Sequence, residues 1–169
     1  MTERDIQAMV TGVVGVGSET VSCGLQSFVY HMNRLPGAWQ KARAEILEAQ
    51  KQGRCQDRAI SYEDAQKLPF IQACIKESLR IFAPVPMTLP RVAPRDGIII
   101  GDMYFPTGTI ISVSPWVVHY SKELWGPDAH EFRPNRWFEE GINEKEKYYY
   151  IPVSPHFDCR LHRYPDVMM

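Results

Sequence analysis

The spacing of apolar side chains predicts helices in the first half of the chain. Residues 3 to about 33 form one largely apolar stretch without proline, which indicates a single long helix ending at Leu35-Pro36-Gly37. A second helix follows, with Lys41 and Glu45 expected to pair on its solvated side. Its apolar stripe is narrow, as is typical of a surface helix, and consists of Trp39, Ala42, Ile46 and Ala49.

Two further helices are expected before the first cluster of prolines. Ser61 stands where an N-cap would open a short helix that stops near Pro69. The next helix ends at Pro84 and Pro86, because proline cannot continue a helix. Its broad apolar face is formed by Phe70, Ile71, Cys74, Ile75, Leu79 and Phe82.

Short β-branched runs replace the helical spacing in the second half. Eleven of the thirteen prolines lie from Pro84 onward. The runs Thr88–Ala93, Ile98–Ile100 and Thr109–Val113 are separated by turn residues and predict short strands and hairpins. Residues 121 to 150 are aromatic, charged and rich in turn formers. The expected fold class is therefore mainly α with short β hairpins.

Composition narrows the class of protein. The chain has 169 residues, a formal net charge of −1, 44% hydrophobic and 23% charged residues, which excludes intrinsic disorder and a nucleic-acid binder driven by positive charge. Four cysteines without a CxxC pair favour an intracellular, reducing compartment. The uncharged stretches Ile6–Ser18 and Thr20–Asn33 each fall short of the roughly 20 apolar residues of a membrane span, so no membrane anchor is expected in this chain.

The first helix carries an unusual succession of small and polar residues: Gly12, Gly15, Gly17, Glu19 and Thr20. Each glycine inside a helix costs about 1 kcal/mol relative to alanine. One interpretation is a groove in which a flat or diatomic ligand approaches the backbone while the acid and the hydroxyl relay protons to it. The other is tight helix packing, with Thr20 donating to the carbonyl of Val16, and these residues alone favour it.

Charged residues in two distant segments form a second candidate. Glu77 and Arg80 lie three apart beside the apolar face of the fourth helix, where they form either a shielded bidentate pair or an exposed pair of little energetic value. Arg136 lies in Phe132-Arg-Pro-Asn-Arg-Trp137, interleaved with aromatic residues. We expect Arg136 to reach Glu77 and fix this irregular segment to the helix.

Several short motifs occur in an order that resembles one known family. Val16–Thr20 is similar to an oxygen-binding motif, and Glu77-Ser-Leu-Arg80 to an ExxR helix. Thr88–Ala93 with Phe105–Thr109 resembles the segment after that helix, and Phe132–Trp137 resembles a meander motif. Together these motifs resemble the cytochrome P450 family of haem-thiolate monooxygenases over residues 1–152.

The resemblance implies a fold and a chemistry for the chain. The fold would be the C-terminal part of the cytochrome P450 fold, incomplete, and the cofactor would be haem. The family inserts one oxygen atom of O₂ into a small organic substrate, with electrons from an NADPH-dependent reductase. By the same resemblance, the parent enzyme would be associated with the endoplasmic-reticulum membrane.

The resemblance also implies roles for single residues. Glu19 and Thr20 would deliver protons to bound dioxygen, and Gly17 would leave room for it. Arg91 would pair with a haem propionate, a contact suited to a guanidinium. The implied structural triad on the haem side of the fold consists of Glu77, Arg80 and Arg136.

The last 17 residues depart from the family pattern. After Pro152 the family continues Phe-Gly-x-Gly-x-Arg-x-Cys-x-Gly, whose cysteine thiolate is the axial iron ligand. Here Arg160 stands at the cysteine position, Cys159 comes one residue early, and both glycines of the turn are missing. We interpret Cys159 as a coincidental, displaced cysteine. Residues 153–169 are predicted to be an unrelated tail, either a translated intron, since an in-frame donor GT-A/G-AGT encodes Val-Ser, or a frameshift.

These departures lead to an expectation of no activity for this chain alone. The alternative class is a non-catalytic remnant or interaction fragment, whose first helix would expose an apolar surface. A third, minor hypothesis is a zinc-binding tail, because three soft ligands lie at equal spacing: His156, Cys159 and His162.

Overall fold

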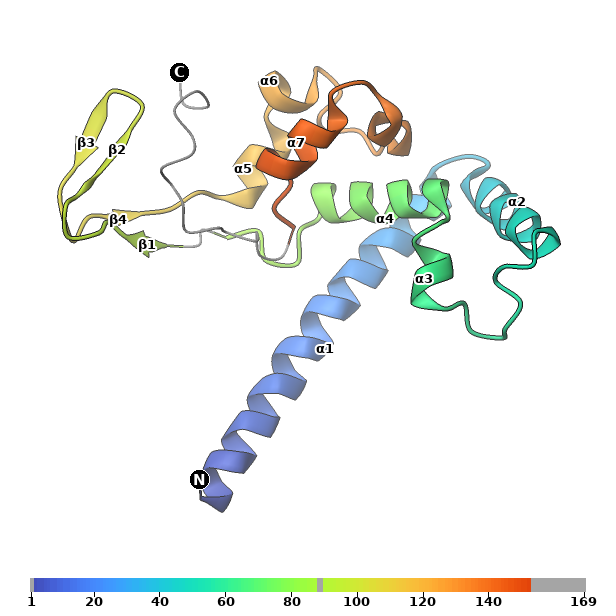
Figure 1. The fold of residues 1–169 in the computed structure, drawn as a ribbon, viewed down its shortest axis with the longest axis horizontal. Helices are drawn as coiled ribbons and strands as arrows, with labels where there is room; N and C mark the ends of the chain where they lie inside the picture. The colour runs from blue at the N-terminus through green and yellow to red at the C-terminus, as the bar shows by residue number, and fades with distance from the viewer. Residues whose placement is uncertain (1, 88–89, 153–169) are drawn as a thin grey trace.

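The computed structural model describes residues 2–87 and 90–152 (Figure 1). Helices α1 (Glu3–Arg34), α2 (Ala38–Lys51), α3 (Tyr62–Ala65) and α4 (Pro69–Ile81) come first. Four short strands follow: β1 (Arg91–Val92), β2 (Ile98–Ile100), β3 (Met103–Phe105) and β4 (Ile110–Ile111). The described chain ends with α5 (Pro115–Tyr120), α6 (Lys122–Trp125), the 3-10 helix η1 (Pro134–Phe138) and α7 (Ile142–Tyr149). This architecture confirms the expected mainly α class with short antiparallel strand pairs.

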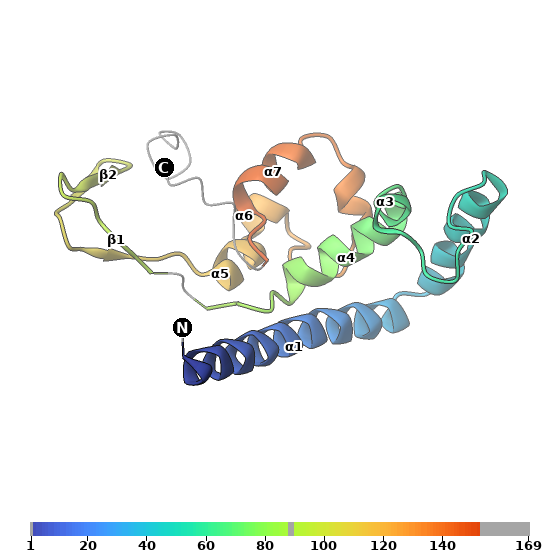
Figure 2. The same cartoon turned by 60° about the horizontal axis from the view of Figure 1, so that its bottom comes forward.

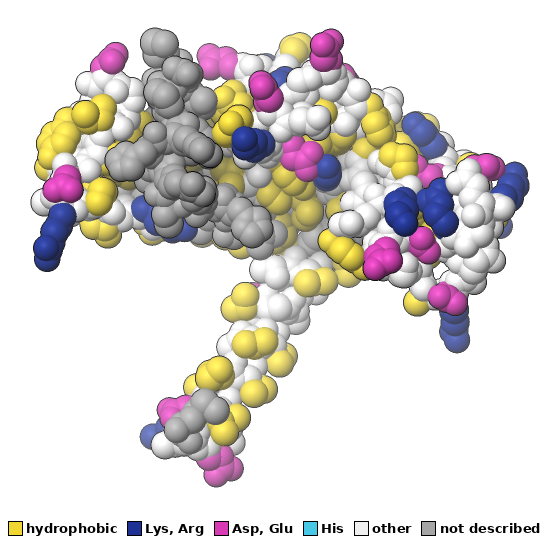
Figure 3. Space-filling model, viewed as in Figure 1, with side chains coloured by type: hydrophobic (Ala, Val, Ile, Leu, Met, Phe, Trp, Pro, Cys, Tyr) yellow, Lys and Arg dark blue, Asp and Glu magenta, His cyan; other side chains and the backbone are white. Residues whose placement is uncertain are grey.

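Helix α1 is a long rod, of which only the C-terminal third packs against the rest of the molecule (Figures 1 and 2). It begins in a capping box between Thr2 and Asp5, in which each side chain accepts from the other's backbone amide. Its buried residues, Ser27 and Met32, both lie near its C-terminal end. Apolar side chains cover the projecting part of the rod, where Val13 is 71% exposed (Figure 3).

By length and composition, α1 could also cross a membrane. An 18-residue window reaches a mean hydropathy of 1.3, and none of it is buried. Every such window of α1 contains Glu19, whereas the sequence expectation counted only uncharged stretches and so missed this possibility. The core helix of a soluble protein satisfies the same criterion.

Helices α2 and α4 are joined by a side chain that the sequence assigned to another role. The two carboxylate oxygens of Glu45 accept the backbone amides of Phe70 (2.8 Å) and Ile71 (3.0 Å), two of the orphan donors at the start of α4. Lys41, the expected partner of Glu45, lies with its ammonium 4.1 Å from the centre of the Phe70 ring. Glu45 therefore caps α4 from a neighbouring helix instead of forming the predicted solvated pair.

Helix α4 is the centre of the fold, and it is buried on more sides than its apolar stripe predicts. Phe70 and Cys74 lie in the core with Met32 of α1 and Ala38 and Ala42 of α2. Two members of the predicted face are exposed instead, Ile75 at 36% and Phe82 at 45%. The reason is that the irregular segment after α5 covers the polar side of α4, so its core is not confined to one apolar face.

The strands form two separate antiparallel pairs, which fits the predicted hairpins. β2 pairs with β3 through Ile98–Phe105 and Ile100–Met103, and β1 pairs with β4. β3 was not predicted as a strand, and only Ile110 and Ile111 of the expected run 109–113 are in β4. Gly97 enables the tight approach of the β2–β3 hairpin: its φ is +70°, and an added Cβ would lie 2.6 Å from the carbonyl oxygen of Phe105.

Candidate functional site

The carboxylate of Glu77 is the centre of a fully buried ionic network. Glu77, Arg80 and Arg136 are exposed by 0%, 1% and 2%, respectively. Oε1 accepts from Arg80 Nη2 (2.9 Å), Arg136 Nε (2.8 Å) and the backbone amide of Arg133 (3.0 Å). Oε2 accepts from Arg80 Nε (3.0 Å) and Trp137 Nε1 (3.0 Å). Five donors thus surround one buried carboxylate.

Arg80 uses every N–H of its guanidinium. Two bonds go to Glu77, in a bidentate fork that suits a planar guanidinium and a carboxylate. Nη1 donates to the backbone carbonyls of His119 (2.6 Å) and Ala129 (2.8 Å), and Nη2 also donates to the carbonyl of Glu131 (3.2 Å). Arg80 therefore binds α4 to the end of α5 and to the loop after α6.

Arg136 brings η1 onto the same carboxylate. Besides its bond to Glu77, it donates to the backbone carbonyls of Trp125 (2.9 Å) and Asp128 (3.0 Å). Arg133, on the rim of the network, forms ion pairs with Asp128 and Glu139. The structure therefore brings together the three charged residues that the sequence singled out.

The contacts of the network join neighbouring segments of the chain, and its charged groups are buried. Burying an ion pair gives little net stability, but removing one partner leaves an uncompensated buried charge and is strongly destabilising. Here the two guanidiniums bind carbonyls at the C-terminal ends of α5 and α6 and in the loop after α6. The arrangement therefore fixes the chain around α4 with defined geometry, and its charged groups are enclosed away from any substrate.

The candidate oxygen-site residues on α1 lie away from this network. Glu19 is exposed, Thr20 is half-buried, and no described atom lies within 4 Å of a Cβ built on Gly17. Thr20 Oγ1 donates to the carbonyl of Val16 at 3.0 Å, the bond expected under the packing interpretation. Because helix neighbours recur at steps of three and four, Gly17 and Thr20 share the face of Gly24, whose Cβ position is 3.4 Å from Leu79 of α4. Gly17 and Thr20 lie on the same face of α1, in the part of the helix that α4 does not cover.

Arg91, the candidate propionate ligand, lies on β1 at the surface. Its guanidinium donates to the backbone carbonyl of Pro90 at 3.0 Å. The structure does not bring Arg91 into contact with Glu19, Thr20 or the network around Glu77.

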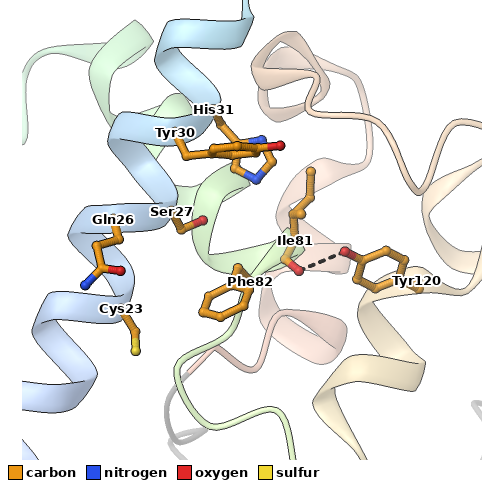
Figure 4. A pocket seen from close by; sticks show the side chains of 8 residues that line it. All are labelled: Cys23, Gln26, Ser27, Tyr30, His31, Ile81, Phe82 and Tyr120. Atoms are coloured by element: carbon orange, nitrogen blue, oxygen red, sulfur yellow. Dashed lines mark hydrogen bonds between the residues drawn. The ribbon is translucent and has the colours of Figure 1, made fainter.

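An open pocket of about 380 Å³ lies where α1 crosses the C-terminal end of α4 (Figure 4). Its walls come from one face of α1, from the end of α4 and from α5. Ser27 Oγ donates to the carbonyl of Ser78 and Tyr120 Oη to that of Ile81, so both hydroxyls are already used. The lining residues are Cys23, Gln26, Ser27, Tyr30, His31, Ile81, Phe82 and Tyr120.

The described residues suit one side of a haem group, and none of their three cysteines, Cys23, Cys55 and Cys74, lies in the family's haem-loop pattern. The open surface at Gly17 would admit a flat group, and a guanidinium at Arg91 suits a carboxylate. Cys55 and Cys74 are buried, and burial raises the pKa of Cys74 to about 12, so its thiol stays protonated. Within residues 2–87 and 90–152, no group of three or more His, Cys, Asp or Glu side chains could hold a metal ion.

Cys159 and the suggested zinc ligands His156 and His162 lie outside the described residues.

Sequence reasoning missed several residues of the network. Trp137 was included only as part of a motif, yet its indole binds Glu77. Asp128 and the backbone carbonyls carried no signal, because a carbonyl turned inward depends on backbone conformation and not on residue type. His119 is 0% exposed, and its Nε2 accepts the backbone amide of Ile151 at 2.9 Å. A lone histidine after an apolar run gives no hint of such a contact.

Comparison with known proteins identifies the class to which this fold and network belong. The cytochrome P450 family model matches residues 1–154, so the chain belongs to the cytochrome P450 family. Cytochrome P450 monooxygenase hepC of Aspergillus oryzae is 36% identical over 140 residues, which cover 83% of this chain and 27% of that protein. Pisatin demethylase of Fusarium vanettenii is 34% identical over 143 residues, covering 85% and 27%, respectively. The chain thus spans about a quarter of the length of these relatives.

Proposed function

We propose that the chain is part of a haem-dependent monooxygenase that inserts one oxygen atom of O₂ into a small organic substrate, with electrons from an NADPH-dependent reductase. The observation that carries this proposal is the buried junction of Glu77 and Arg80 with Arg136, because it links two of the motifs on which the family resemblance rests. The family match over residues 1–154 supports it.

In this proposal, α1 supplies the residues on the oxygen side. Haem, when bound, would supply the chemistry for activating dioxygen. Gly17 leaves the helix surface open, and Glu19 and Thr20 lie beside it as the proposed proton-relay residues. The Thr20 hydroxyl donates its hydrogen bond to the carbonyl of Val16, so its oxygen is left to accept a hydrogen bond from another donor. Arg91 would bind a propionate.

We also propose that this chain alone is inactive, because Arg160 stands where the family pattern has its iron-binding cysteine. The test is reconstitution of the purified 169-residue chain with haem, followed by the ferrous–CO difference spectrum. We expect no signature of thiolate ligation, whereas an intact relative treated in the same way gives one. A thiolate spectrum from this chain would overturn the proposed inactivity and would show that one of its four cysteines binds the iron.

We propose that residues 153–169 are unrelated to the family domain formed by residues 1–152. The family match ends at residue 154, which supports this boundary. Genomic DNA downstream of the Pro152 codon provides the test. If splicing near that codon does not restore Phe-Gly-x-Gly-x-Arg-x-Cys, a translated intron is the wrong explanation.

A non-catalytic interaction fragment is the second candidate, favoured by the exposed apolar surface of α1. Sedimentation of the purified chain discriminates between the two: self-association or capture by detergent micelles supports an interacting α1. A monodisperse monomer that unfolds cooperatively contradicts an interacting α1.

For the whole protein, we propose association with the endoplasmic-reticulum membrane. Cell fractionation of the full-length enzyme would test this location.

A further inference from the structure

His119 lies beside the ionic network and connects it to the end of the described chain. Its backbone carbonyl accepts from Arg80 Nη1, which fixes the last turn of α5 to α4. Its ring stacks on Tyr150, with the ring centroids 5.8 Å apart, and meets the ring of Trp125 edge-on at 6.3 Å. Its Nε2 lies 2.9 Å from the backbone nitrogen of Ile151. One buried residue therefore touches α4, α6 and the segment after α7.

The hydrogen bond to Ile151 determines where the imidazole carries its proton. A backbone amide can only donate, so Nε2 must accept and is unprotonated. A neutral imidazole has a single N–H, which therefore lies on Nδ1. Burial, with a further contribution from the guanidinium of Arg80, lowers the pKa of His119 to about 4, so the ring is neutral at pH 7.

Packing alone does not explain a histidine at this position. Nδ1 is the one buried side-chain nitrogen or oxygen of the described residues that has no hydrogen-bond partner. A buried donor without an acceptor is costly, and a phenylalanine would fill similar space without that cost. What histidine adds is the acceptor at Nε2, which holds the amide of Ile151.

We propose that His119 is a positioning residue. Its neutral Nδ1–H form accepts the amide of Ile151 and so connects residues 151–152 to the network of Glu77, Arg80 and Arg136. Arg80 fixes the backbone of His119, and the ring of His119 fixes Ile151. The inference rests on the proposed function in one respect: in the family pattern the haem-binding loop follows the position of Pro152, a pattern that residues 153–169 of this chain do not keep.

Three substitutions separate the acceptor from the other properties of the ring. His119→Gln keeps an oxygen acceptor near the position of Nε2 and removes the donor at Nδ1. His119→Asn keeps an N–H near Nδ1 and is too short to reach Ile151. His119→Phe keeps the aromatic contacts and removes both polar atoms. His130→Phe, at an exposed histidine, is the matched control.

The readout is amide hydrogen exchange of Ile151 in the 15N-labelled 169-residue chain, followed by NMR. We expect exchange to be about tenfold faster in the Asn and Phe variants and close to wild type in the Gln variant and the control, because only the former lose the acceptor. Exchange of the Trp137 indole N–H, bound to Glu77, reports whether the network itself stays folded. Wild-type protection of Ile151 in the Phe variant, or loss of protection in the Gln variant with Trp137 still protected, would overturn the proposal.

A second measurement needs no variant. In 15N-histidine-labelled wild-type protein, the ring nitrogens of His119 should show a protonated Nδ1 and an unprotonated Nε2 at pH 7. The opposite tautomer would overturn the proposal, and this measurement stays valid even if every substitution prevents folding. An unprotected Trp137 indole in the wild type would also overturn it, because the network would then be absent. Neither result involves haem, so failure here is distinct from failure of the CO-spectrum test.

Discussion

The ionic network around α4 and the projecting part of α1 differ in where their partners come from. Glu77, Arg80 and Arg136 find all their hydrogen-bond partners within the described chain, including carbonyls more than 35 residues away. The residues before Gly24 in α1 are nearly all exposed. The comparison teaches that the charged network finds its partners among the described residues, whereas the face of α1 that carries Glu19 and Thr20 is not enclosed by them.

The largest expected effect tests the self-contained network. Glu77→Ala would leave two buried guanidiniums without their anion, and we expect a loss of about 3–5 kcal/mol in the free energy of unfolding. Urea denaturation followed by tryptophan fluorescence measures it. Glu48→Ala, at the exposed partner of Lys51, is the control and should change stability by less than about 0.5 kcal/mol. Equal effects of the two would mean that the network is open to water.

The next largest effect is a dependence on pH. The pKa of His119 is lowered to about 4 in the folded state from 6.5, so between these values the unfolded chain binds more protons. The contribution of neutral His119 to the free energy of unfolding is fully present above pH 6.5. It is lost progressively as the pH falls to about 4, by about 3 kcal/mol in all. Denaturant titrations at several pH values should show this slope in the wild type and not in His119→Gln. Parallel slopes would contradict a buried neutral histidine.

A smaller effect tests the junction of α2 and α4. Glu45→Ala removes the acceptor for the amides of Phe70 and Ile71, and we expect a loss of about 1–2 kcal/mol, typical of a helix N-terminal cap. Glu45→Gln keeps one acceptor oxygen and should lose less. The same denaturation assay measures both. If Glu45→Ala is neutral, the carboxylate is solvated as the sequence pattern suggested.

The smallest effect tests the exposed part of α1. Gly12→Ala and Gly15→Ala meet no described atom within 4 Å, so each should increase helix content and raise stability by at most about 1 kcal/mol. Circular dichroism and thermal unfolding measure these changes. Gly97→Ala is the contrasting variant, since it combines a φ of +70° with a steric clash and should destabilise the β2–β3 hairpin. Destabilisation by the α1 variants would show that this surface is covered in solution.

The parts of the fold that were predictable are those encoded in residue type. The long first helix, the proline-terminated α4 and the contact between Arg136 and Glu77 follow from apolar spacing, from proline chemistry and from charges placed among aromatic residues. The role of Glu45 was not predictable, because an i,i+4 lysine offered a local partner, whereas the donors that it binds are backbone amides 25 and 26 residues away.

The unpredicted parts of the candidate site depend on backbone conformation. Arg80 and Arg136 are satisfied by carbonyls of His119, Trp125 and Ala129, which any residue could supply. The exposure of Ile75 and Phe82 also depends on backbone conformation. The segment after α5 packs on the polar side of α4 and leaves these two apolar residues uncovered. Glu19 and Thr20 were found as a pattern, but the structure leaves their roles as a proposal.

The network also has a consequence for variation in chain length. Glu77 binds Arg136 across 59 positions, so the chain from the end of α4 to η1 is a loop closed at both ends, and the β2–β3 hairpin lies within it. The entropic cost of closing a flexible loop grows only logarithmically, by about 0.6 kcal/mol for each doubling of its length. Residues inserted at the tip of this hairpin would therefore cost little stability.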